Sequence, residues 1–103
     1  MKQFTNNEQT RKLKELGFPT PKSVSDHEYD AEMGRTTILK NYSIGELLGF
    51  LDDGITESDE ELMVWKDTVF WYVKFSQGGG CHDVELIDAL YQYCIILKTE
   101  GII

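Results

Sequence analysis

Residues 61–75 (ELMVWKDTVFWYVKF) constrain the fold most, because apolar and polar side chains alternate on either side of a polar interruption at 66–68. Alternation with a period of two is typical of β-strands. We therefore expect an antiparallel hairpin over 62–75, with strands at 62–65 and 69–75. One face would carry Val69, Trp71, Val73 and Phe75, and the other Phe70, Tyr72 and Lys74. Because both faces hold large apolar groups, either helices cover both faces or one face is left for a partner.

The C-terminal segment predicts a helix that can cover one of these faces. Residues 84–99 should be helical, with Asp83 as the N-cap and Gly101 just beyond the end. A broad apolar stripe at helical spacing would consist of Leu86, Ile87, Leu90, Tyr91, Cys94 and Leu97. We expect this stripe to pack across the sheet, which gives a fold of the α+β class.

The N-terminal segment predicts a short basic helix. Residues 7–16 can be capped by Asn6 or Thr5, and Gly17 stands where a left-handed residue ends a helix. The 22 N-terminal residues hold five Lys and Arg against two Glu, whereas the remainder holds five against sixteen Asp and Glu. We expect residues 1–22 to form a basic N-terminal helix that docks loosely on an acidic body.

The middle of the chain contains the clearest helix signal. Ser43 and Glu46 are spaced as a capping box, which predicts a helix over 44–51. Before this helix, residues 36–41 are rich in β-branched side chains and can form a short strand, either alone or added to the expected hairpin. Residues 22–34 show no periodicity and are expected to form a loop.

Length and composition limit the classes of function. A chain of 103 residues, of which 41% are hydrophobic, is expected to form a single domain, 1–103, with its own core. The formal net charge of −8 opposes binding to nucleic acid and to anionic membrane surfaces, and favours a basic protein partner. No apolar run approaches the length of a membrane helix or of a secretion signal, so we expect a cytoplasmic protein.

One stretch, 76–85 (SQGGGCHDVE), contains residue types that are used in catalysis. A cysteine before a helix can have a lowered pKa and a histidine can serve as its base, so a small enzyme using Cys81 with His82 or His27 is an alternative. Neighbouring residues rarely point at each other, however, and the acids that follow would repel an anion held by the glycines. We therefore expect a flexible joint between strand and helix, with no catalytic site.

Metal sites and cofactors are not expected. The segment 26–31 (DHEYDA) has Ala31 where a zinc-protease motif requires a second histidine. The acidic run 52–61 lacks the spacing of an EF-hand loop and is expected to be solvated. Five acids of this run can still attract a basic partner, namely Asp52, Asp53, Glu57, Asp59 and Glu60.

Four segments follow one another along the chain: EQTRKLKELGF, YSIGELLGFL, WYV and ELIDALYQYCIILK. This pattern resembles a family of small uncharacterised proteins of gut bacteria and of their phages and mobile elements. The resemblance spans most of the chain, and YSIGELL and ELIDALY are its most specific parts. No activity is established for that family, so the resemblance implies no catalytic residue and only an accessory role.

The sequence therefore favours a small acidic protein-interaction module, an accessory or phage-encoded modulator. Phe70 and Tyr72 are the expected partner-binding residues, together with the acids of 52–61. A ligand-binding module is a further alternative, which requires a sizeable pocket with converging polar groups.

Overall fold

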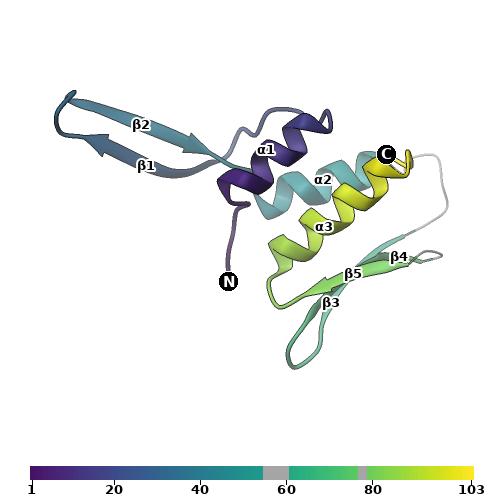
Figure 1. The fold of residues 1–103 in the computed structure, drawn as a ribbon. Coiled ribbons are helices and arrows are strands. Elements are labelled where there is room, and N and C mark those ends of the chain that lie inside the picture. The colour runs from purple at the N-terminus through teal and green to yellow at the C-terminus, as the bar shows by residue number, and fades with distance from the viewer. Residues whose placement is uncertain (55–60, 77–78) are drawn as a thin grey trace.

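The computed structural model describes residues 1–54, 61–76 and 79–103, and it has the expected α+β architecture (Figure 1). The described elements are α1 (Asn7–Glu15), β1 (Val24–Asp30), β2 (Arg35–Lys40), α2 (Ile44–Gly54), β3 (Leu62–Lys66), β4 (Trp71–Phe75), β5 (Gly80–Asp83) and α3 (Leu86–Thr99). They form two antiparallel sheets, one of β1 and β2 and one in the order β3-β4-β5. The expected hairpin over 62–75 is confirmed as β3 and β4.

One part of the hydrophobic core lies between α3 and one face of the three-stranded sheet, as the sequence predicts, and residues of α1 and α2 complete it (Figure 1). Val73, Phe75 and Cys81 of this sheet are buried in the core, and α2 packs beside α3. A buried hydroxyl also joins the two layers: Tyr93 Oη in α3 accepts from Phe75 N at 3.1 Å and donates to Gly79 O at 3.0 Å. Helix α3 thereby holds both the end of β4 and the residue that precedes β5.

Local capping signals are confirmed for α1 and α2. Asn6 Oδ1 accepts from Gln9 N at 2.8 Å, and Gln9 Oε1 accepts from Asn6 N at 3.0 Å. Ser43 and Glu46 make the same reciprocal pair of bonds at the start of α2. Both α1 and α3 are followed by a glycine with positive φ, namely Gly17 (97°) and Gly101 (76°).

The segment before α3 differs from the prediction. The N-cap position is occupied by Glu85, whereas Asp83 ends β5 and its carboxylate accepts from Glu85 N and from Gln92 Nε2. The prediction of a flexible joint over 76–85 is wrong for 80–83, because these residues pair with β4 as a third strand. A four-residue strand without apolar alternation gives no local signal, since its formation depends on contacts with β4.

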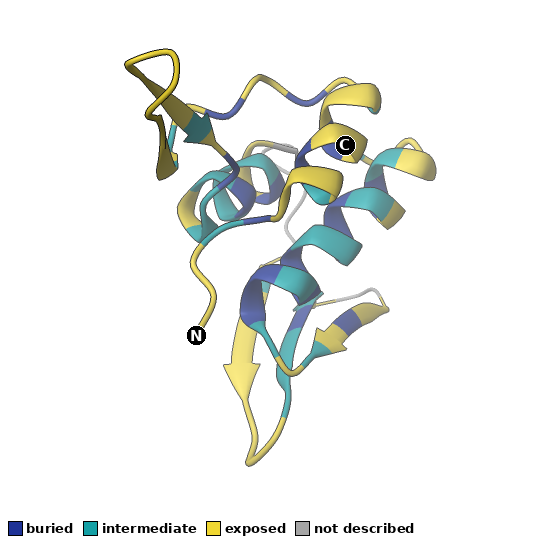
Figure 2. Cartoon of the chain, turned by 60° about the vertical axis from the view of Figure 1, so that its left-hand side comes forward, coloured by how far each residue is buried: buried dark blue, intermediate teal, exposed yellow. Residues whose placement is uncertain are grey.

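The segment before α2 differs as well. Residues 22–34 are not a loop, because most of them form β1, which pairs with β2 in a separate hairpin. The strand expected at 36–41 therefore does not join the three-stranded sheet. Nearly every side chain of the β1–β2 hairpin is exposed, so neither face requires apolar alternation (Figure 2). The hairpin projects from the body (Figure 1), and the radius of gyration is 15.3 Å, against about 13 Å for a compact chain of this length.

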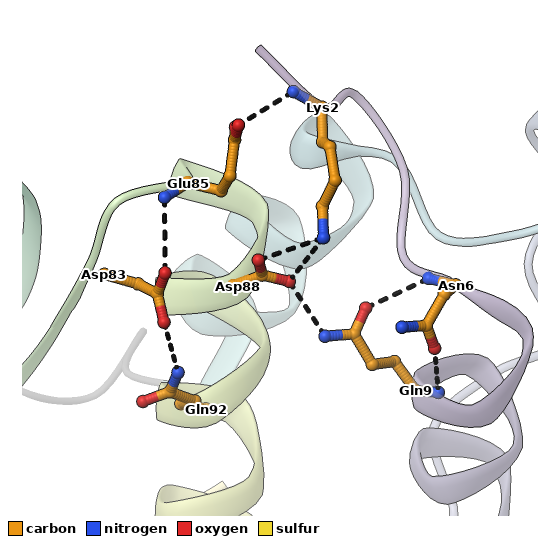
Figure 3. Close-up of polar contacts among 7 residues, drawn as sticks. All are labelled: Lys2, Asn6, Gln9, Asp83, Glu85, Asp88 and Gln92. Carbon is orange, nitrogen blue, oxygen red and sulfur yellow. Dashed lines mark hydrogen bonds and ion pairs between the residues drawn. The ribbon is translucent and has the colours of Figure 1, made fainter.

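A polar seam joins the N-terminal segment to α3 (Figure 3). Lys2 Nζ lies 3.0 Å from Asp88 Oδ2, and Lys2 N donates to Glu85 Oε2 at 3.0 Å. Gln9 Nε2 in α1 donates to the same Asp88 carboxylate at 2.9 Å. Because Leu13 of α1 is also fully buried in the core, this helix is docked by apolar as well as polar contacts.

A buried polar network lies under α1. Thr10 Oγ1 donates to Asn41 Oδ1, and Asn41 Nδ2 donates to Ser25 Oγ at 2.9 Å. Thr5 Oγ1 lies 2.7 Å from Thr10 Oγ1 and accepts from Tyr42 N at 3.1 Å. Since the single hydroxyl hydrogen of Thr10 is used for Asn41, Thr5 donates to Thr10. The network links the N-terminal segment, α1, the base of the β1–β2 hairpin and the residues before α2.

Candidate protein-contact surface

The face of the three-stranded sheet that points away from α3 carries a group of aromatic rings. Directly paired residues share a face, so Trp65 of β3, Tyr72 of β4 and His82 of β5 lie side by side there. Phe70, which precedes β4, contacts the rings of Tyr72 and His82. Trp65 is 43% exposed, and Phe70 and Tyr72 are half-buried. We call Trp65, Phe70, Tyr72 and His82 the aromatic cluster.

The rings of the aromatic cluster form a column across the three strands. The Trp65 and Tyr72 rings stack with centroids 5.2 Å apart and planes at 9°, and Tyr72 and His82 stack at 5.6 Å and 28°. Phe70 meets His82 edge to face at 5.3 Å. Because the rings stack on one another, few ring faces are left for the nucleobase stacking that single-stranded nucleic acids need.

Asp67 fixes the turn that presents the cluster. Its Oδ1 accepts from Val69 N at 2.8 Å and from Phe70 N at 2.7 Å, and its Oδ2 accepts from the Tyr72 hydroxyl at 2.7 Å. These bonds, led by the one from Phe70 N, hold the pKa of Asp67 below its ordinary value. The same carboxylate raises the pKa of the Tyr72 hydroxyl, so this hydroxyl remains a donor at neutral pH.

Two hollows bear on the ligand-binding alternative. One, of about 220 Å³, lies beside the aromatic cluster between Trp65, Tyr72 and residues of β5. Pockets for drug-sized ligands usually measure about 300–1,000 Å³, so this hollow is small for such a ligand. The other, of about 570 Å³, is lined by residues 28–32 and Thr37, all of which belong to the projecting hairpin. Neither is an enclosed pocket with converging polar groups.

The residues of the enzyme alternative are not brought together. Cys81 is buried on the side of α3, whereas His82, the next residue of β5, lies in the aromatic cluster on the opposite face. His27 is exposed on β1, in the other sheet. Successive side chains of a strand point to opposite faces, so the backbone of β5 separates the Cys81 thiol from the His82 imidazole.

Both cysteines are free thiols, and both are buried. Burial raises the pKa of Cys81. Burial and, to a smaller extent, the nearby Cys81 thiol raise the pKa of Cys94 to about 12. Because the thiolate is the nucleophilic form, neither residue is activated at neutral pH. Cys94 serves as a small core residue, as its position in the apolar stripe predicts.

We expect neither cysteine of the folded protein to react with a thiol reagent at pH 8, and both to react in denaturant. The free energy of unfolding should also fall as the pH rises from about 9 towards about 12, because the unfolded chain then loses thiol protons that the folded chain keeps. Mass spectrometry of labelled protein and urea unfolding at several pH values measure these effects. Cys94→Ala is the control, and its stability should depend less on pH over this range. Rapid labelling of Cys81 in the folded protein would contradict the assignment.

Of the five acids expected to attract a partner, two lie within the described residues. Asp52 and Asp53 lie exposed at the C-terminal end of α2, whereas Glu57, Asp59 and Glu60 lie outside the described residues.

Among residues 1–54, 61–76 and 79–103, no group of three or more His, Cys, Asp and Glu side chains is placed to hold a metal ion. In the same part of the chain, no helix has the length and apolar character needed to cross a membrane.

Sequence reasoning singled out Phe70 and Tyr72 of the aromatic cluster for partner binding, but not their neighbours Trp65 and His82. Trp65 could have been found from the hairpin register, because the turn at 67–70 sets it opposite Tyr72. No signal in the sequence places His82 in the cluster, because its position depends on the pairing of β5 with β4.

Comparisons with known proteins do not assign the chain to a family: no match is found among protein-family models, curated proteins or solved structures. Function is therefore inferred from the aromatic cluster, the positions of the thiols and the charge of the chain.

Proposed function

We propose that the protein is a small acidic protein-interaction module and that its contact surface is the aromatic cluster. The observation that carries this proposal is that α3 covers one face of the sheet, whereas Trp65, Tyr72 and His82 lie on the other face. Trp and Tyr are favoured at the centres of protein interfaces because they bury a large area with few rotatable bonds. The hydrogen bonds of Asp67 hold the turn and the Tyr72 ring in place before binding, which lowers the entropy cost of association.

The partner is proposed to be a basic protein. The chain carries a net charge of −8, and residues 23–103 hold most of its acids. Charge of one sign steers a partner of the opposite sign and repels nucleic acid. The resemblance to small proteins of phages and mobile elements supports an accessory role, as a cytoplasmic modulator of a host protein.

A photoreactive benzophenone side chain at position 70 tests the contact surface. In extracts of the cells that carry the gene, irradiation should crosslink a specific protein from this position. The yield should fall several-fold when salt is raised from about 0.1 M to about 1 M before irradiation, because the Debye length shortens from about 10 Å to about 3 Å.

The matched control places the same side chain at Ile96, which is 42% exposed on α3. The proposal is supported if a protein is crosslinked when the photoreactive side chain is at position 70 and is not crosslinked when it is at position 96. Equal products from the two positions, no product from position 70, or a product that is insensitive to salt would count against it.

A further inference from the structure

One edge of strand β3 has no strand partner among residues 1–54, 61–76 and 79–103. The strand pairs with β4 on one side only, in the sheet order β3-β4-β5. The bonds from Ser76 N to Glu61 O and from Asp67 N to Phe70 O mark the two ends of the pairing. Both bonds use an odd-numbered residue on the β3 side, namely Glu61 and Asp67. Because bonded and non-bonded residues alternate along an antiparallel pair, the backbone groups of the odd-numbered residues of β3 bond to β4, and those of the even-numbered residues point away from it. The outward-facing backbone groups are those of Leu62, Val64 and Lys66.

The two faces of β3 are also poorly covered. Val64, on the same side of the sheet as α3, is 37% exposed, and Trp65 on the opposite side is more exposed still. Helix α3 packs mainly on β4 and β5, and in β3 it is Leu62, at the start of the strand, that packs against the core. Within the described residues, β3 is therefore an apolar strand that is open at one edge and, beyond Leu62, on both faces.

Apart from one lysine at its end, the usual protections of an edge strand are missing from β3. The segment LMVWK contains no proline, its register with β4 runs without a bulge, and its only charge is Lys66 at the end. Natural proteins normally blunt an exposed edge with charges, prolines or bulges, because unpaired N–H and C=O groups are a template for another strand. The composition of β3 thus suits a strand that is paired in the working protein.

We propose that the edge of β3 pairs with β3 of a second copy of this chain, antiparallel and about a two-fold axis. Pairing centred on Val64 sets Met63 of one copy opposite Trp65 of the other, so apolar groups meet on the open face. The two three-stranded sheets then form one six-stranded sheet, a common size for a stable sheet. Each copy presents the same edge to the other, as a two-fold interface requires.

Charge favours a second copy over the basic partner of the proposed function at this edge. Segment 61–66 holds one acid, Glu61, and one base, Lys66, so it is locally neutral although the whole chain carries −8. The neighbouring Asp67 adds one negative charge, and Lys74, which is paired with Met63, adds one positive charge. A basic partner would find no excess of negative charge here, and two copies meet little local repulsion. A five-residue strand buries less than a standard interface of about 1,600 Å², so the dimer should be weak and concentration-dependent.

Sedimentation velocity of the full chain between about 10 µM and about 1 mM tests the dimer. The wild type should shift from monomer to dimer over this range. Val64→Lys and Val64→Glu should each remain monomeric, because like charges then face each other across the two-fold axis. An equimolar mixture of the two variants should regain the dimer, because opposite charges then meet. If association depended only on the net charge of the chain, Val64→Lys would strengthen it, because this variant is less negative than the wild type. The proposed pairing predicts the opposite result for Val64→Lys.

The matched controls are Val69→Lys and Val69→Glu, which introduce the same charges at an exposed valine of the turn, away from the edge. Both should dimerise like the wild type. A wild type that stays monomeric, controls that lose the dimer, or a mixture of Val64 variants that stays monomeric would each overturn the proposal. Because Val64 is not part of the aromatic cluster, Val64→Lys should keep the crosslink from position 70, so the two proposals can fail separately.

Discussion

Gly80→Ala is expected to lower the free energy of unfolding by about 3 kcal/mol, at the upper end of the usual range for overpacked sites. A Cβ on Gly80 would lie 2.3 Å from Val73 O and 2.5 Å from Lys74 Cβ. Neither atom can give way, because one belongs to the backbone of the central strand and the other is fixed to the backbone directly opposite. Strand β5 must therefore shift away from β4, which pulls Cys81 out of the core.

Gly79→Ala is the matched control for this prediction. A Cβ on Gly79 would meet no atom within 4 Å, so the change should alter the free energy of unfolding by no more than about 0.5 kcal/mol. Urea unfolding followed by tryptophan fluorescence measures both variants. Equal stability of the two would mean that β4 and β5 are not as close at Gly80 as the structure has them.

The start of α2 and the end of α1 could be predicted because capping depends on residues that are close in sequence. Ser43 and Glu46 bond each other across three residues, and Gly17 needs only its own positive φ. The hairpin of β3 and β4 is similarly local, since Asp67 closes its turn with bonds to residues two and three positions later.

Strands β1 and β5 could not be predicted, for two different reasons. Both faces of β1 are exposed, so no buried face imposed the apolar alternation by which strands are recognised. Residues 80–83 contain a glycine and three side chains of mixed polarity, and they become a strand only because Gly80 lets β4 approach closely. The expected N-cap at Asp83 was wrong for the same reason, since pairing with β4 extends to that residue.

The candidate site also has a part that the local sequence predicts and a part that depends on β5. The parity of the hairpin set Phe70 and Tyr72 on the face opposite Val73, and the structure leaves that face uncovered by α3. The third ring of the column, His82, comes from β5 and could not be predicted without it. The separation of Cys81 from His82 also depends on β5, because only a strand sends neighbouring side chains to opposite faces.

Thr10→Val is expected to lower the free energy of unfolding by about 2–4 kcal/mol, because two buried hydrogen bonds are lost and a stranded buried polar atom costs about 1–3 kcal/mol. The Asn41 amide oxygen loses its donor, and the Thr5 hydroxyl loses its acceptor. Valine keeps the shape of threonine, so the packing of α1 changes little. Thermal and urea unfolding measure the loss, and Thr10→Ser, which keeps the hydroxyl and removes only a methyl group, should cost about 1 kcal/mol or less.

A double-mutant cycle with Asn41→Ala separates the network from packing. The Asn41 side chain also bonds Ser25, so its removal alone loosens the base of the β1–β2 hairpin as well as the contact with Thr10. Once the Asn41 side chain is absent, Thr10→Val no longer strands an amide oxygen, so the double variant should be more stable than the sum of the two losses predicts, by about 1 kcal/mol or more. Additive losses would mean that Thr10 and Asn41 do not share a hydrogen bond. The hydroxyl of Thr10 would then hold α1 to the residues before α2 only through Thr5.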